Sequence, residues 1–81
     1  MAKVPAVHEI YGVTSRQTQH RIIDALRRKR NLKATEDRRD GHRLVVVDCP
    51  ESRAQWVFRK VTSIDPRAML LLAARSDRKV A

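Results

Sequence analysis

The residues best suited to chemistry are side-chain hydrogen-bond donors grouped in one stretch of the sequence. In GVTSRQTQHRIIDAL, residues 12–26, arginine, glutamine and histidine occupy positions 16–21 together with Thr18, and apolar residues follow them. Ile22, Ile23 and Leu26 recur at helical spacing, so they predict one apolar stripe with the donors on the other side. Ser15 is the expected N-cap, because its hydroxyl can accept an amide proton that lacks a partner within the helix. The exposed face has the donors to enter the major groove of DNA, although an ordinary amphipathic helix has the same pattern.

Catalytic and metal-binding patterns are weak by comparison. Cys49 is the single cysteine, and a lone cysteine after a valine-rich strand is more often a small buried residue than a nucleophile. The two glycines do not form a phosphate-binding loop. The three histidines lie on different expected elements, without the spacing of metal ligands: His8, His20 and His42. We therefore expect neither an enzyme nor a metal or cofactor site.

The composition favours an anionic partner. The chain has 81 residues, enough for one small domain, and 18 Lys and Arg against 9 Asp and Glu give a formal charge of +9. Such a charge attracts polyanions, which favours a nucleic acid or an anionic membrane surface. The longest apolar run, residues 68–74, is far shorter than the roughly 20 residues that span a bilayer. With no disulfide possible within the chain and no targeting segment, we expect a soluble cytoplasmic protein, associated with the nucleoid.

A short helix is expected before residues 12–26. Pro5 suits the first position of a helix, and Val7, Ile10 and Tyr11 follow at helical offsets. Gly12 can take the positive φ that ends a helix, so the two helices would form a helix-turn-helix pair.

A basic hairpin is expected after it. DRRDG, residues 37–41, contains an Asp-Gly turn signal, and HRLVVVD, residues 42–48, is rich in valine and predicts a strand. Three positive charges lie at or near the hairpin tip: Arg38, Arg39 and Arg43. They could reach a phosphate backbone or a minor groove.

These motifs together resemble a known family. GVTSRQTQHRIIDALRRKRNL followed by DRRDGHRLVVVD is similar to the recognition helix and wing of winged helix-turn-helix regulators, most closely the MarR type, over residues 4–48. The resemblance implies a transcriptional regulator, or an accessory factor of a mobile element, that binds double-stranded DNA. It places Arg16, Gln17, Thr18, His20 and Arg21 in the groove. It assigns phosphate or wing contacts to a further set: Ser15, Arg28, Arg30, Arg38, Arg39 and Arg43.

The sequence departs from the family in three places, of which one is mild: Asn31 stands where a glycine commonly caps the recognition helix, and asparagine also tolerates the left-handed conformation. The helix that usually precedes the helix-turn-helix pair is missing, and Gln19 stands where an apolar residue is usual. A buried glutamine either weakens the core or makes a buried hydrogen bond.

The second half of the chain could complete the core. Residues 51–62 predict one helix, and Asp65-Pro66 predicts the start of another over residues 67–75. Four apolar residues crowd that second helix and indicate either core filling or a homodimer interface: Met69, Leu70, Leu71 and Leu72.

The sequence thus predicts a single domain, residues 1–81, that is α+β but mostly α: a winged helix-turn-helix with a two-stranded wing, and C-terminal helices over residues 51–76. The alternative is a ferredoxin-like β-α-β-β-α-β domain, with strands at 7–13, 32–36, 42–48 and 68–73, that acts in RNA binding or as a regulatory interaction module. That alternative lacks the aromatic platform on which RNA-binding sheets stack bases.

Overall fold

Four strands and two helices alternate along the chain. The structure is a computed structural model that describes residues 3–79, with the side chains of residues 5–75. The elements are β1 (Lys3–Gly12), α1 (Arg16–Arg27), β2 (Lys33–Arg39), β3 (His42–Pro50), a short 3₁₀ helix η1 (Glu51–Arg53), α2 (Ala54–Ile64) and β4 (Met69–Lys79).

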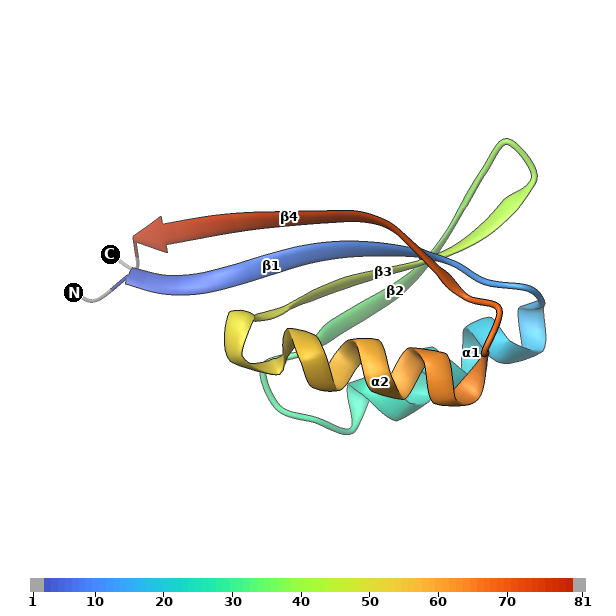
Figure 1. The fold of residues 1–81 in the computed structure, drawn as a ribbon, viewed down its shortest axis with the longest axis horizontal. Coiled ribbons are helices and arrows are strands. Elements are labelled where there is room, and N and C mark those ends of the chain that lie inside the picture. The colour runs from blue at the N-terminus through green and yellow to red at the C-terminus, as the bar shows by residue number, and fades with distance from the viewer. Residues whose placement is uncertain (1–2, 80–81) are drawn as a thin grey trace.

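The strands form one antiparallel sheet in the order β2-β3-β1-β4, and both helices cover the same face of it (Figure 1). This β-α-β-β-α-β arrangement is the ferredoxin-like fold. The expected winged helix-turn-helix, mostly α, is therefore wrong, and the alternative architecture is correct.

The segment expected to be the first helix is part of β1. Val7, Glu9 and Tyr11 all point toward the helices and are buried, which is the two-residue period of a strand. The pattern is hidden in the sequence because the middle residue of the three is a glutamate. Gly12 does not join two helices, since it ends a strand that pairs with both β3 and β4.

The last expected helix is strand β4. The C-terminal half therefore contains α2 and η1 but no second α-helix among residues 51–76. Asp65 forms a turn instead of a helix start: its Oδ1 accepts a hydrogen bond from the Arg67 N–H at 3.1 Å, and its carbonyl accepts one from the Ala68 N–H at 2.9 Å. The four residues expected on one helix, Met69, Leu70, Leu71 and Leu72, lie on this strand.

The central helix forms as expected. The Ser15 hydroxyl accepts a hydrogen bond from the Thr18 N–H at 3.1 Å, and the Thr18 hydroxyl oxygen accepts one from the Ser15 N–H at 3.3 Å. This reciprocal cap satisfies two backbone donors at the helix start. Ile22, Ile23 and Leu26 are buried, as the apolar stripe predicted.

The basic hairpin also forms as expected, as β2 and β3. Arg39 pairs with His42 across a two-residue turn, in which Asp40 has a φ of 51° and Gly41 a φ of 79°. Positive φ at both turn residues is the requirement of the type I′ hairpin, which Asp-Gly satisfies. The hairpin extends past the body of the domain at the upper right of Figure 1.

The core lies between the sheet and the helix pair. Tyr11 of β1 and the valines of β3 pack there against residues of both helices. Its fully buried large side chains are Tyr11, Ile22, Leu26, Val45, Val47, Val57 and Val61. This core sets α1 against β2 and β3, and so places the start of α1 beside the hairpin.

Candidate nucleic-acid interface

A hollow in the surface lies between the start of α1 and the hairpin. Three of its lining residues are arginines, one from each of α1, β2 and β3. The lining residues are Arg16, Gln19, Glu36, Asp37, Arg38 and Arg43. The fold thus brings together one arginine expected on the recognition helix and two expected on the wing. We call these three residues, Arg16, Arg38 and Arg43, the arginine triad.

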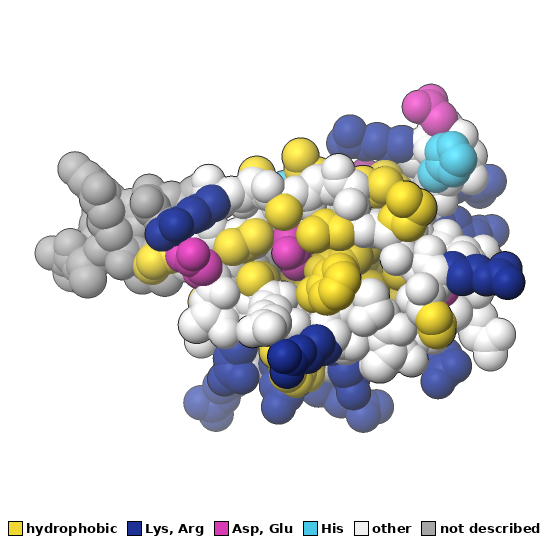
Figure 2. All heavy atoms as spheres, in the orientation of Figure 1, with side chains coloured by type: hydrophobic (Ala, Val, Ile, Leu, Met, Phe, Trp, Pro, Cys, Tyr) yellow, Lys and Arg dark blue, Asp and Glu magenta, His cyan; other side chains and the backbone are white. Residues whose placement is uncertain are grey.

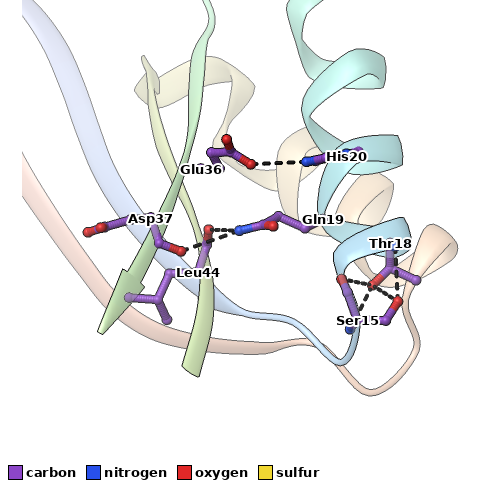
Figure 3. A network of polar contacts seen from close by, with 7 residues as sticks. All are labelled: Ser15, Thr18, Gln19, His20, Glu36, Asp37 and Leu44. Carbon is purple, nitrogen blue, oxygen red and sulfur yellow. Dashed lines mark hydrogen bonds and ion pairs between the residues drawn. The ribbon is translucent and has the colours of Figure 1, made fainter. Parts of the chain in front are cut away.

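Gln19 fixes the helix against the hairpin at this hollow. Its side chain is buried, and Nε2 donates to the carbonyl oxygen of Leu44 at 2.9 Å and to that of Asp37 at 3.3 Å (Figure 3). Since these two carbonyls belong to opposite strands, one amide group holds both arms of the hairpin. Of the two outcomes expected for Gln19, the buried hydrogen bond is the one found.

The two carboxylates of the hollow are engaged elsewhere. Glu36 Oε2 lies 3.0 Å from His20 Nε2, and Asp37 Oδ2 lies 3.4 Å from Arg39 Nε. Among the described residues, no ion pair joins a member of the arginine triad to a carboxylate. The three guanidinium groups therefore line the hollow beside two carboxylates without a direct ion pair to either, and their planar donor forks suit the oxygens of a phosphate.

The remaining expected DNA contacts are distributed more widely. Gln17, His20 and Arg21 lie exposed on α1, but His20 is paired with Glu36 (Figure 3). The hydroxyls of Ser15 and Thr18 are both used in the helix cap. Arg28 and Arg30 follow the C-terminal end of α1, about 18 Å along the helix from Arg16. The structure therefore does not gather them around the hollow.

A buried carboxylate that the sequence did not indicate lies beneath the sheet. Glu9 Oε1 accepts a hydrogen bond from the Tyr11 hydroxyl at 2.8 Å, and both residues face the helices. Burial raises the pKa of Glu9, partly offset by that hydrogen bond. Because a glutamate interrupts the apolar alternation between Val7 and Tyr11, no pattern in the sequence marks Glu9 as buried.

Cys49 lies in the same core and shows the chemistry of a structural thiol. The pKa of Cys49 is raised to about 11. Burial is the largest cause, and the nearby Glu9 and Asp48 carboxylates add to it. The thiol is therefore protonated near neutral pH, and a protonated buried thiol is a poor nucleophile.

Among the described residues, no group of three or more His, Cys, Asp or Glu side chains is placed to hold a metal ion. No helix in residues 3–79 is long and apolar enough to cross a membrane.

Comparison with known proteins identifies the fold and no relative of known activity. No family model and no curated protein matches the chain. Among solved structures, the chain is similar to the de novo designed protein Foldit4, with a TM-score of 0.60 and 14% sequence identity over 96% of this chain and 100% of that one. A de novo designed protein with a ferredoxin fold matches with a TM-score of 0.38 and 19% identity, over 99% of this chain and 88% of that one. The first likeness is one of fold alone.

Proposed function

We propose that this protein binds RNA through the phosphate backbone, and that the arginine triad is the anchor of the site. The observation that supports the proposal is the meeting of Arg16, Arg38 and Arg43 at one hollow whose carboxylates are paired with other residues. The formal charge of +9 adds a long-range attraction for any polyanion.

Backbone contact is favoured over base stacking on the sheet. The chain has one Tyr, one Trp and one Phe, and Tyr11 is buried while Trp56 and Phe58 belong to α2. The open face of the sheet thus lacks the aromatic side chains on which RNA-recognition sheets stack bases. Folded RNA with loops or bulges presents single phosphates at irregular angles, which suits a hollow built by three separated arginines.

Insertion of α1 into a major groove is the second candidate, and exposed Arg16, Gln17 and Arg21 on one helix favour it. Against it, Asp24 on the helix lines a second hollow beside α1. This carboxylate would face the phosphates of the groove walls. In addition, α2 packs along one side of α1 and limits how far α1 can enter.

The proposal is tested by titrating the full chain with a labelled RNA hairpin and with a DNA duplex of matched length, each at two salt concentrations. Arg43→Ala should weaken RNA binding about tenfold and reduce the slope of log affinity against log salt by about 0.7 for each phosphate that is no longer neutralised. Arg59→Ala, which removes an exposed arginine of α2, is the matched control and should change affinity less than about twofold.

Two results would contradict the proposal. Equal losses in Arg43→Ala and Arg59→Ala would mean that net charge alone determines binding. Tighter binding to the duplex, with a preference among duplex sequences that Gln17→Ala abolishes, would favour the second candidate instead.

A further inference from the structure

The two edges of the sheet are built differently. The β2 edge has the sequence KATEDRR, and Arg27 of α1 donates from Nε to the carbonyl oxygen of Ala34 at 3.1 Å. Charged residues and a covering side chain are the usual means by which proteins prevent a sheet edge from pairing with another strand. The β4 edge has neither feature over residues 69–74, whose sequence is MLLLAA.

β4 is exposed on both of its faces. Met69 is 65% exposed, Leu70 39%, Leu71 56% and Leu72 45%. The strand pairs with β1, but α1 packs mainly against β2, β3 and α2. The register shift opposite Ile10 and Tyr11 makes Leu71 an extra residue, so Leu71 and Leu72 are exposed next to each other. An apolar edge segment that is this exposed on both faces is unusual in a monomer.

The helix α2 also exposes an apolar side chain. Trp56 of α2 lies at the α1 side, where Lys29 Nζ is 5.4 Å from its ring centroid. Phe58 is two residues further, about 200° around the helix, so it points away from α1, and it is 45% exposed. In Figure 2, hydrophobic side chains gather on the face where β4 and α2 lie nearest the viewer. We call Phe58, Met69, Leu70, Leu71 and Leu72 the apolar edge.

We propose that a second copy of this chain adds its β4 to this β4 in antiparallel orientation, so that two four-stranded sheets become one. The strand is self-complementary, because a twofold axis near Leu71 and Leu72 places the apolar residues 69–74 of each copy opposite one another. In this register Arg67 and Arg75 lie outside the paired segment, and neither arginine faces its own counterpart. Residues 68–74 contain no charge, so the paired segment itself places no like charges opposite one another, and Arg67 of each copy lies close to the partner's Arg75 just beyond its two ends.

The exposed apolar side chains supply about two thirds of the ~1,200 Å² at which specific interfaces begin. Five large side chains, each about half exposed, offer roughly 400 Å² per copy if a large apolar side chain has about 150 Å². The paired backbone and two alanines add to this, which brings the two copies toward the ~1,200 Å² at which specific interfaces begin. A homodimer was expected from the same four residues on a helix; here the proposed interface is a strand edge.

Sedimentation equilibrium of the full chain tests this proposal. We expect a dimer at tens of micromolar that tightens as salt rises, because salt screens the repulsion between two positive chains. Leu72→Lys and Met69→Lys should each weaken the dimer at least tenfold. Thr35→Lys places the same charge at an exposed position on the opposite edge and is the matched control, with no expected effect.

Far-UV circular dichroism shows whether each variant is folded. If a lysine variant does not fold, Leu72→Cys provides an independent measurement, since a cysteine near the twofold axis should give a disulfide-linked dimer under mild oxidation while buried Cys49 stays reduced. A chain that remains monomeric to about 0.5 mM would overturn the proposal. A dimer that survives both lysine substitutions, or that Thr35→Lys breaks instead, would also overturn it.

The proposed dimer and the proposed RNA site can be refuted independently of each other. The arginine triad lies at the hairpin end and uses no residue of the apolar edge. Loss of dimerisation in Leu72→Lys with retained RNA affinity per chain would leave the proposed function intact, and loss of RNA binding in Arg43→Ala should leave the dimer unchanged.

Discussion

The carboxylate of Asp65 holds Thr14, which lies 51 positions earlier in the chain: Oδ2 accepts hydrogen bonds from the Thr14 N–H at 2.9 Å and from its hydroxyl at 2.8 Å. Asp65 ends α2, and Thr14 immediately precedes the capped start of α1. One buried side chain therefore joins the ends of the two helices that cover the sheet, next to the cap from which Arg16 extends.

Asp65→Ala should lower the free energy of unfolding by about 2 kcal/mol, because hydrogen bonds to a charged group contribute roughly 1.5–3 kcal/mol. Urea denaturation followed by circular dichroism measures this loss. Asp24→Ala is the matched control, since Asp24 is an exposed carboxylate on α1, and its loss should stay within about 0.5 kcal/mol. An equal change in both variants would contradict a special role for the hydrogen bonds between Asp65 and Thr14.

The same pair of residues predicts acid sensitivity. Burial by itself would raise the pKa of Asp65, but the hydrogen bonds from Thr14, Arg67 and Thr18 outweigh it and hold the pKa below its usual 3.8. The folded chain thus binds fewer protons than the unfolded chain in this range. The stability from Asp65 is present above pH 3.8 and is lost as the pH falls through the lower, folded pKa. Asp65→Asn should flatten this acid limb of a plot of stability against pH.

Glu9 should have the opposite pH dependence. Burial raises its folded pKa above 4.5, so between 4.5 and the raised value the folded chain holds more protons than the unfolded chain. The free energy of unfolding therefore falls as the pH rises through this window and stays lower above it. Glu9→Gln keeps a side-chain oxygen to accept from Tyr11, so it should raise stability at neutral pH and remove this slope.

Tyr11→Phe is the companion variant for Glu9. It removes the hydrogen bond that partly offsets the burial of Glu9, so it should lower stability at neutral pH by about 1–3 kcal/mol. Thermal unfolding between about pH 4 and 8 distinguishes the two variants. A Glu9→Gln protein that is less stable than the original at neutral pH would show that the ionised carboxylate is well solvated.

Local chemistry predicted the middle of the chain well. The Ser15 cap, the apolar stripe of α1 and the Asp40-Gly41 turn each depend on residues within one turn of helix or hairpin, so their sequence signals are complete. The arginines of α1 and of the hairpin were identified individually. That Arg16 meets Arg38 and Arg43 at one hollow depends on the packing of α1 on the sheet, which no local pattern contains.

The helices predicted for the segments that form β1 and β4 were wrong for a shared reason. β1 has a buried glutamate at an inward position and Ile10 at an outward one, so its alternation is masked. β4 has apolar residues on both of its faces, and Leu71 is an extra residue at the register shift, so its sequence does not alternate either. A strand is recognised in a sequence by alternating apolar and polar residues, and neither of these two segments shows that alternation.

Gln19→Leu should separate the hairpin from α1. The substitution removes the donor to the carbonyls of Leu44 and Asp37 and should cost about 1–3 kcal/mol of stability, because the buried Leu44 carbonyl loses a partner. Amide exchange of residues 38–43 should become faster than in Gln17→Leu, the control at an exposed position of the same helix. RNA affinity should fall as well, since the arginine triad would no longer be held together; unchanged exchange in the hairpin would contradict this reasoning.

Arg38 and Arg43 allow a test in which stability and RNA binding should change in opposite directions. The two residues are directly opposite each other across β2 and β3, and like charges at such positions are destabilising. Arg38→Thr should therefore raise the free energy of unfolding by about 0.5 kcal/mol while it weakens RNA binding. Arg39→Thr is the control with the reverse expectation for stability, because Arg39 pairs with Asp37 and lies opposite His42 rather than an arginine. Urea denaturation and RNA titration of both variants measure the two effects. A gain in stability with undiminished RNA binding would mean that the paired arginines serve neither the fold nor the proposed site.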